Sequence, residues 1–319
     1  MSGVGGVVSR GKVAYRVVEP QISAEGVHVW PFQDPSFPVD VTFLRFDSRH
    51  LIRMNRHNFF EIAYVYSGSG TLGIQDRILT AKKGDLLVIG STLYHRITGK
   101  SRMPLVLAAL FFEPNLIRTD SGVEGTELLA PFLWQDPDFP HIVPAKTGIP
   151  TQVFDLMQQI RGELPSDDPR VRLAVRTYLR MILALLMMHF SAHTGGVARA
   201  QRQEQALARF QPLFRYLEEK AAEPMHIRDA ARICAMSESH FMALFKATTG
   251  QSFTAYLNHY RVERAQSLLT RTDKTISEIS QELGFCDQSY FGTVFRRLSG
   301  MTPASYRRRS RPVLSAGPS

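Results

Sequence analysis

The chain is poor in the features that mark secreted, disulfide-bonded or membrane-spanning proteins. Among its 319 residues there are only two cysteines, Cys234 and Cys286, and they suggest neither a disulfide framework nor a zinc site. The longest apolar run, 181–188, is far too short to cross a bilayer. The first residues lack the basic start and apolar core of a signal peptide. We therefore expect a cytoplasmic protein without membrane contact, long enough for two domains.

Motifs of common enzyme classes are also missing. The sequence has no recognisable nucleophile triad, phosphate-binding loop or dinucleotide fingerprint. We therefore expect no enzyme activity, no catalytic residue and no cofactor. What the chain does have is positive charge. Its formal net charge is +9, and residues 205–319 carry 16 Lys and Arg against 10 Asp and Glu. Such a region suits the phosphate backbone of a nucleic acid, although an anionic membrane surface attracts the same charge.

A pattern of two helices separated by a tight turn occurs twice between residues 227 and 306. In each copy the first helix has one apolar face. A small residue follows, Ala235 or Gly284, and then a polar helix cap, Ser237 or Asp287. The apolar face of the next helix is formed by Phe241, Leu244 and Phe245 in one copy and by Phe291, Val294 and Phe295 in the other. Two matched helix-turn-helix units predict sequence-specific DNA binding, because the opposite face of each second helix is free to enter a major groove.

Residues 205–308 resemble the AraC/XylS family of bacterial transcription regulators. The resemblance includes a helix that joins the two units, and the segments 284–291 (Gly-Phe-Cys-Asp-Gln-Ser-Tyr-Phe) and 300–307 (Gly-Met-Thr-Pro-Ala-Ser-Tyr-Arg). In that family the joining helix holds two recognition helices about one DNA turn apart. The resemblance therefore implies binding to double-stranded promoter DNA, RNA polymerase as a partner, and activation more often than repression.

Carried over by position, the resemblance assigns two groups of DNA-contacting residues. The base-reading positions are Ser239, Met242 and Ala243 in the first unit and Gln288, Ser289, Gly292 and Thr293 in the second. Met242 and Ala243 cannot form bidentate hydrogen bonds, so they either contact a thymine methyl group or contribute little to readout. The phosphate-binding candidates are Lys246, Arg296 and Arg297, for which the alternative is a solvated basic surface.

Residues 39–112 have the character of a β domain. Strand-like segments at 41–46, 60–66 and 105–112 are separated by turn signals, which suggests a sandwich or barrel. The apolar runs alternate only in part, so we expect both faces of the sheet to be covered. The segments 57–68 and 84–95 resemble the two cupin motifs, and the N-terminal domains of many AraC-type regulators are cupin-like barrels that sense an effector.

Three residues stand where cupin enzymes place metal ligands: His57, Glu61 and His95. His and Glu suit a transition metal, but the remaining histidine position is occupied by Asn55. We therefore predict an effector-binding site without a metal. The alternatives are that these side chains hydrogen-bond to one another at the mouth of a pocket, or that they hold a metal after all.

Helices follow the barrel. One is expected at 149–163, and Asp168-Pro169 should begin another. The resemblance implies that this pair forms a homodimer, whereas the simpler alternative is that it closes the barrel's own core. The predicted organisation is a sensing domain at 1–192 with dimerisation helices at about 149–192, a linker at 193–204, a double helix-turn-helix domain at 205–310 and a loose tail at 311–319.

The fold class expected is thus α+β, with a cupin-like β-barrel and helical pair before an all-α domain. The function expected is a transcription regulator controlled by a small-molecule effector in the barrel. Two rivals predict different observations. A metal-dependent cupin enzyme fused to a DNA-binding module should hold stoichiometric metal and turn over a substrate. An architectural DNA binder without a ligand should show no thermal shift with any small molecule.

Overall fold

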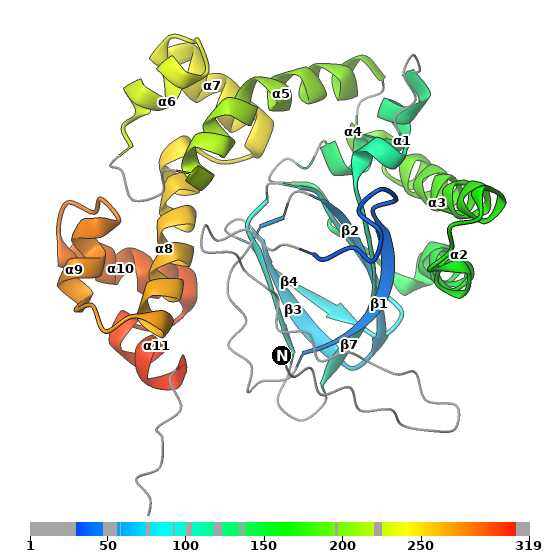
Figure 1. The fold of residues 1–319 in the computed structure, drawn as a ribbon, viewed down its shortest axis with the longest axis horizontal. Coiled ribbons are helices and arrows are strands. Elements are labelled where there is room, and N and C mark those ends of the chain that lie inside the picture. The colour runs from blue at the N-terminus through cyan, green and yellow to red at the C-terminus, as the bar shows by residue number, and fades with distance from the viewer. Residues whose placement is uncertain are drawn as a thin grey trace, which may run out of the picture.

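The computed structural model describes residues 30–310, apart from 47–55, 58, 75–76, 92, 100–103, 118–122, 134, 136–137, 195–196 and 220–224. A β-barrel with helices on one side occupies one half of the described chain, and a purely helical region occupies the other (Figure 1). The fold class is therefore the α+β arrangement that the sequence predicts. The predicted tail at 311–319 and the residue Asn55 lie outside the described residues.

Two antiparallel sheets form the barrel. The larger has the strand order β1-β7-β2-β5-β8 and the smaller the order β4-β3-β6. The strands are β1 (Val39–Phe46), β2 (Phe60–Ser67), β3 (Ser69–Ile74), β4 (Arg77–Lys82), β5 (Leu86–Ile89), β6 (His95–Gly99), β7 (Leu105–Phe112) and β8 (Ile142–Val143). The three strand-like segments of the sequence correspond to β1, β2 and β7, so these strand predictions are confirmed.

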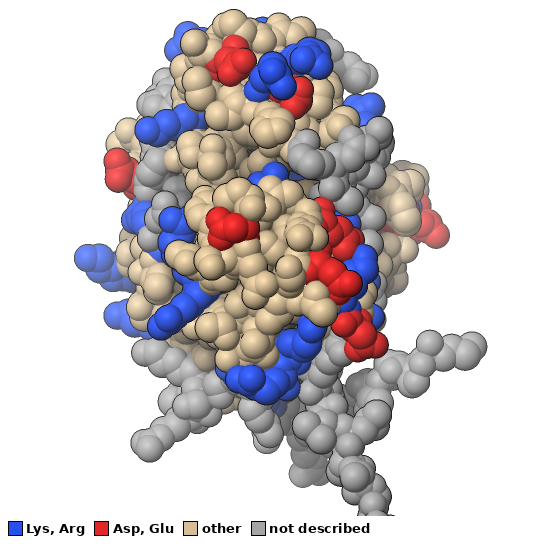
Figure 2. Space-filling model, turned by 90° about the vertical axis from the view of Figure 1, so that its left-hand side faces the viewer, with Lys and Arg blue, Asp and Glu red and all other residues tan. Residues whose placement is uncertain are grey.

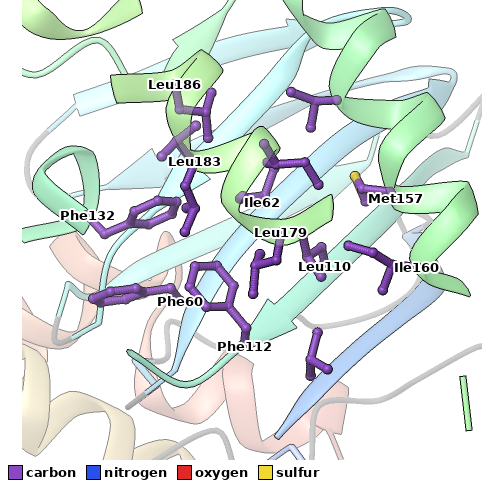
Figure 3. Close-up of a cluster of buried hydrophobic side chains, with 14 of the residues drawn as sticks. Phe60, Ile62, Leu110, Phe112, Phe132, Met157, Ile160, Leu179, Leu183 and Leu186 are labelled. Atoms are coloured by element: carbon purple, nitrogen blue, oxygen red, sulfur yellow. The ribbon is translucent and has the colours of Figure 1, made fainter. Parts of the chain in front are cut away.

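The larger sheet is buried on both faces, which explains its incomplete polar alternation. All eight residues of β7 are buried. Leu107 and Phe111 face the barrel interior, where they join one apolar cluster. Leu110 and Phe112 face outward and join a second cluster with α1 (Val123–Leu133), α2 (Ile149–Glu163) and α3 (Pro169–His189), as Figure 3 shows. The covering of both faces is confirmed.

The helical pair begins as the sequence predicts. The Asp168 side chain accepts a hydrogen bond from the backbone N–H of Arg170, and Pro169 occupies the first helical position. Val153, Met157 and Ile160 of α2 are fully buried against the sheet. These helices therefore cover the core of the barrel. This role leaves their outer surfaces available for the predicted dimer.

The helical region contains α5 (Val197–Glu219), α6 (Ile227–Ile233), α7 (Glu238–Thr249), α8 (Phe253–Arg271), α9 (Ile276–Glu282), α10 (Gln288–Ser299) and α11 (Pro303–Ser310). A short helix, α4 (Ser191–Thr194), precedes it. We call α6 and α7 the first unit and α9 and α10 the second unit. Helix α8 runs between them and contributes to the apolar cluster of each (Figure 1).

Helix α5 begins inside the segment 193–204 that the sequence assigned to a linker. From Val197 onward that segment is helical, although it looked irregular because of the preceding glycines. The domain boundaries themselves stay a prediction. Among the described residues, none of the helices is both long and apolar enough to cross a membrane.

Candidate functional site

The two units have the same turn, built from different residues. Ala235 and Gly284 both adopt the left-handed backbone conformation, with φ of 53° and 70°. The next residue in each turn donates a backbone hydrogen bond to the first helix, from Met236 to Ala231 and from Phe285 to Ser280. The sequence predicted small residues here; the structure adds the positive φ, which is the stronger reason for glycine in the second unit.

The predicted helix caps are present. Ser237 and Asp287 accept hydrogen bonds from the backbone N–H groups of His240 and Tyr290, at 3.4 and 2.7 Å. Helix α9 also has the capping box formed by Thr275 and Glu278. Because these caps fix where each helix begins, they also fix which side chains lie on its exposed face.

Helices α7 and α10 are held by aromatic side chains. Phe241 and Phe245 of α7 and Phe291 and Phe295 of α10 are fully buried. The faces opposite these rings are the candidate DNA-reading surface. Six of the seven predicted base-reading residues are exposed, and one is half-buried. The exposed ones are Ser239, Met242, Ala243, Gln288, Ser289 and Thr293, and the half-buried one is Gly292.

The chemistry of the two reading faces differs. Met242 is 44% exposed and offers only an apolar thioether side chain. Gln288 offers an amide, the group that pairs with adenine in a major groove. The Thr293 hydroxyl donates to the backbone carbonyl of Ser289 at 3.1 Å, which leaves its oxygen as an acceptor. The second unit therefore has the polar groups that direct base recognition needs, and the first has fewer.

The predicted phosphate-binding residues lie beside these faces. Lys246, Arg296 and Arg297 are all exposed, in the last turns of α7 and α10. Sequence reasoning missed Arg308 and Arg309 of α11, which are also exposed, although the Arg run at 307–309 was a visible signal. Figure 2 shows the side of the molecule on which the helical region lies. In the lower part of this view, Lys and Arg side chains (blue) lie along the left edge and the base, and Asp and Glu side chains (red) gather along the right edge. The charge is therefore segregated in this lower part, whereas red and blue side chains lie next to one another in the upper part.

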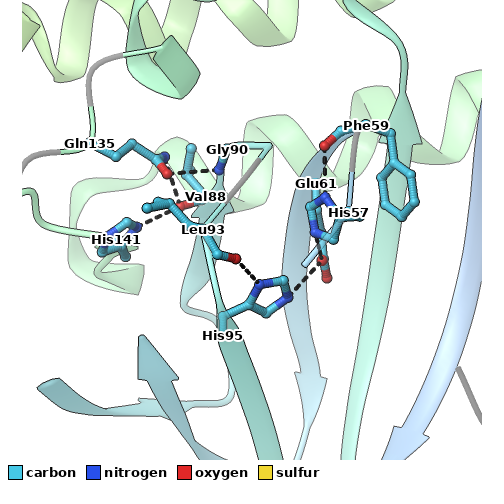
Figure 4. A network of polar contacts seen from close by, with 9 residues as sticks. All are labelled: His57, Phe59, Glu61, Val88, Gly90, Leu93, His95, Gln135 and His141. Atoms are coloured by element: carbon cyan, nitrogen blue, oxygen red, sulfur yellow. Dashed lines mark hydrogen bonds and ion pairs between the residues drawn. The ribbon is translucent and has the colours of Figure 1, made fainter. Parts of the chain in front are cut away.

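A second candidate site lies inside the barrel. Glu61 is on β2, His95 begins β6 and His57 precedes β2, and all three side chains are buried. One Glu61 carboxylate oxygen lies 3.2 Å from His57 Nε2 and 3.7 Å from His95 Nε2 (Figure 4). The three cupin-like positions that the sequence singled out therefore converge, with ligand atoms within 4.8 Å of one another.

Backbone carbonyls fix the orientation of both imidazole rings. His57 Nδ1 donates to the carbonyl of Phe59 at 2.7 Å, and His95 Nδ1 donates to that of Leu93 at 3.0 Å. A neutral ring that donates from Nδ1 has a lone pair on Nε2. In that state both Nε2 lone pairs face the Glu61 carboxylate.

Burial and hydrogen bonding act on the ionisation of this site in opposite directions. Burial lowers the pKa of His57, which favours its neutral ring. Burial alone would raise the pKa of Glu61, but its hydrogen bonds with His57 and His95 outweigh burial and hold this pKa well below its usual value. Because each Nδ1 already donates to a carbonyl, a ring can donate from Nε2 to Glu61 only when it carries both protons; a neutral ring would instead need a cation or a ligand's donor group between Nε2 and the carboxylate.

The three side chains also pass a test for a divalent metal ion. Ligands about 2.1 Å from one transition metal lie some 3–3.5 Å apart, close to the spacings of Glu61 from His57 and His95. Metal-bound histidines typically donate their other ring N–H to a carbonyl, as both do here. The residues present therefore fit such an ion better than the sequence suggested.

Other buried groups join the barrel to the helical region, and sequence reasoning missed them. Tyr94 is fully buried in the apolar cluster of the first unit, and Arg96 donates to the backbone carbonyl of Ser299 at 3.1 Å. Arg56 is buried with its guanidinium 6.0 Å from the centre of the Phe214 ring. The available signal was their position, since each is a sequence neighbour of His57 or His95.

Comparison with known proteins agrees with both halves of the structure. The family described as "AraC-like ligand binding domain" matches residues 38–183, and the family described as "Helix-turn-helix domain" matches residues 230–309. The HTH-type transcriptional activator RhaR of Klebsiella pneumoniae is 28% identical over 255 residues, which cover 80% of this chain and 87% of RhaR.

Two further comparisons extend over most of the chain. The MmsAB operon regulatory protein of Pseudomonas aeruginosa is 24% identical over 302 residues, 93% of this chain and 90% of that protein. The crystal structure of ToxT from Vibrio cholerae O395 superposes with a TM-score of 0.50 at 13% identity, covering 86% of this chain and 99% of ToxT, which supports the fold alone. The relatives are regulators rather than enzymes, and the chain belongs to the AraC family of DNA-binding transcriptional regulators, with an AraC-like ligand-binding domain before its helix-turn-helix domain.

Proposed function

We propose that this protein activates transcription from promoter DNA under the control of a small-molecule effector bound in its barrel. The observation that carries the proposal is the pair of matched recognition helices, whose exposed faces hold the predicted base-reading residues. Activation is supported by relatives that are named transcriptional activators. On this proposal the protein works in the cytoplasm, beside its promoter, with RNA polymerase as a partner.

The two units contact DNA in the same way. Lys246, Arg296 and Arg297 bind phosphates and fix the position of the protein, while α7 and α10 enter successive major grooves about 34 Å apart. Sequence discrimination comes mainly from Gln288, Ser289 and Thr293, because the first unit offers Met242 and Ala243 where hydrogen-bonding groups would be needed.

Footprinting of the full chain on a DNA site selected from a random pool tests this proposal. Two protected major-groove patches per subunit, on one face of the duplex, are expected. A single patch would mean that one unit does not engage DNA. Absence of any selected site would overturn the proposal as a whole.

The effector site is the barrel triad of His57, Glu61 and His95. Regulation requires only that a ligand prefer one arrangement of the protein over another, so turnover and a catalytic metal are unnecessary. A ligand that supplies a hydrogen-bond donor or positive group would satisfy the Glu61 carboxylate and the two Nε2 lone pairs, while the aromatic rings of Phe59 and Phe111 would contact its apolar part.

A second candidate is a barrel that holds a divalent metal at the same triad. The converging Nε2 lone pairs are the observation that favours it. Elemental analysis of protein purified without chelator separates the two. Near-stoichiometric iron, zinc or manganese that is lost in His95→Ala would establish the metal. Substoichiometric metal, unchanged in His95→Ala, would support the metal-free site.

We also propose that α3 mediates a homodimer. Leu173, Met181 and Met188 are 62%, 50% and 70% exposed along its outer surface, and a second copy of this surface would cover them. Met181→Glu should convert a dimer to a monomer in sedimentation velocity. Ile78→Glu is the matched control, because Ile78 is an even more exposed apolar residue (76%) that lies on β4, away from α3. Dimers that persist in Met181→Glu would contradict this arrangement.

A further inference from the structure

One short segment of the barrel reaches both halves of the helical region: it joins the apolar cluster of the first unit and contacts the end of α10 in the second. We call Tyr94, His95 and Arg96 the strap. Successive side chains of an extended segment point to opposite sides. His95 points into the barrel and faces Glu61, whereas Tyr94 and Arg96 point outward to the helical region. The strap therefore places a residue of the proposed effector site between two residues that touch the DNA-binding domain.

Tyr94 is built into the core of the first unit. Its ring is fully buried, stacks on His259 with centroids 5.4 Å apart, and meets Tyr256 edge-on at 5.2 Å. Both partners are on α8, and Tyr256 in turn packs on Phe245 of α7. A displacement of Tyr94 consequently reaches the recognition helix of the first unit through one intervening ring.

Arg96 holds the second unit. Its guanidinium donates to the carbonyl of Ser299, the last residue of the recognition helix α10. A positive charge at this end of a helix is favourable because the free carbonyls there carry partial negative charge. Burial lowers the pKa of Arg96, which reflects how much of the guanidinium the interface covers.

A parallel arrangement occurs at the other histidine of the triad. His57 faces Glu61, while its neighbour Arg56 is buried near Phe214 of α5. Charges on both sides act on Tyr94: Arg56 from the barrel favours ionisation of its hydroxyl and Glu263 from α8 opposes it, although burial is the main cause of its raised pKa.

We propose that the strap transmits the state of the barrel triad to the DNA-binding domain by fixing how the two units are positioned relative to each other. A ligand that moves His95 must shift Tyr94 and Arg96, because the three are consecutive residues of one extended segment. Helix α8 is also linked to the second unit, since Asn258 donates to the Tyr290 hydroxyl at 3.4 Å and Arg261 lies over the Phe285 ring. The strap adds a connection to the barrel. This inference rests on the proposed function, because it concerns the regulation of the same site.

A double-mutant cycle in the full chain tests the strap without an identified ligand. Glu61→Gln perturbs the triad, since it replaces the carboxylate with an amide that can donate to Nε2. Arg96→Gln cuts the contact with Ser299. Affinity for the selected DNA site is measured by fluorescence anisotropy for the four proteins. We expect Glu61→Gln to change the affinity by about fivefold or more in the wild-type background, and by less than about twofold in the Arg96→Gln background.

Arg77→Gln is the matched control. Arg77 is a half-buried arginine on the same three-stranded sheet, and its guanidinium also donates to a backbone carbonyl, that of Phe139. The effect of Glu61→Gln should be the same with and without this substitution.

Equal effects of Glu61→Gln in the wild-type and Arg96→Gln backgrounds would overturn the strap, as would no effect in either. Hydrogen exchange of residues 256–263 in α8 gives a readout that does not need DNA. If Glu61→Gln alters their protection but no variant binds DNA, the strap stands as a physical connection and the proposed function fails. If protection is unchanged, the strap fails.

Discussion

The two helix-turn-helix units have the same plan but differ in how independent they are. The apolar cluster of the second unit is formed by α8, α9, α10 and Tyr306 of α11, all from the helical region. The cluster of the first unit includes Tyr94, which comes from the barrel. The second unit also has the polar reading face and two of the three predicted phosphate-binding residues. The comparison teaches that two copies of one fold can diverge: the first shares a buried aromatic ring with the barrel, whereas the second touches the barrel through the Arg96 hydrogen bond at the end of α10 and carries the polar face proposed to read bases.

The largest effect should come from removing an aromatic residue of the second unit. Phe291→Ala deletes a fully buried ring, a change that costs about 3–5 kcal/mol. Because the cluster of the second unit is separate, hydrogen exchange should rise in α9 and α10 while α6 and α7 keep their protection. Met242→Ala, on an exposed position, is the control. Simultaneous loss of protection in all four helices would show that the units are not independent.

Salt dependence should divide unequally between the units. Three phosphate contacts correspond to a slope of about −2.7 in log affinity against log salt, or roughly a 40-fold loss between 50 and 200 mM. Replacing Arg296 and Arg297 together with Ala should reduce the slope by about 1.8, and Lys246→Ala by about 0.9. Binding titrations at several salt concentrations measure these slopes. If the two variants reduced the salt slope equally, the phosphate contacts would be divided equally between the two units, and the units would not differ in this respect.

Sequence preference should depend on the second unit. Loss of a base contact through Gln288→Ala should reduce discrimination by about 1–3 kcal/mol and change the selected consensus. Arg296→Ala should instead weaken binding to all sequences alike, since phosphates carry no sequence information. Met242→Ala should leave the consensus unchanged. A consensus altered by Met242→Ala and not by Gln288→Ala would reverse the roles of the two units.

The smallest effect concerns the turns. A left-handed backbone conformation costs a residue other than glycine roughly 1–2 kcal/mol. Glycine avoids this cost, but it also makes the unfolded chain more flexible, which lowers the stability of the folded protein by about 0.4–1 kcal/mol. Ala235→Gly should therefore stabilise the first unit by less than about 1 kcal/mol, and Gly284→Ala should destabilise the second by a similar amount. Urea midpoints compared at unchanged m-values measure both. Changes of the same sign would mean that the turns are not equivalent.

Most of the helical region could be predicted from the sequence because its determinants are local. Each helix is marked by a cap and an apolar spacing that can be recognised within a few neighbouring residues. The structure contains the caps, which are Ser237, Thr275 and Asp287. The resemblance also selected His57, Glu61 and His95 correctly as neighbours in space. The DNA-contacting and effector-binding roles of these positions stay predictions, even though the exposure of the first group and the convergence of the second agree with them.

Contacts between the two halves could not be predicted in this way. Tyr94 is an aromatic residue just before a strand. Nothing local distinguishes a residue of the barrel core from one that packs on Tyr256 and His259, far along the chain in the helical region. The orientation of the two imidazole rings was equally hidden, because it depends on the backbone carbonyls of Phe59 and Leu93 rather than on the spacing of the histidines. The start of α5 at Val197 was also hidden in the sequence, because the residues before it lack helical periodicity. Its packing partner, α1, lies in the sensing half and is distant in the sequence.

The position of Tyr94 also bears on how new biosensors are assembled from parts. A chimera that attaches the helices of this protein to a foreign sensing domain at the interdomain junction would leave the aromatic site formed by Tyr256 and His259 empty. Grafts should therefore be designed with an aromatic residue at the equivalent of Tyr94 and an arginine two positions later. The compatibility of parts then depends on these two sensor residues and on their partner surfaces on α8 and at the end of α10.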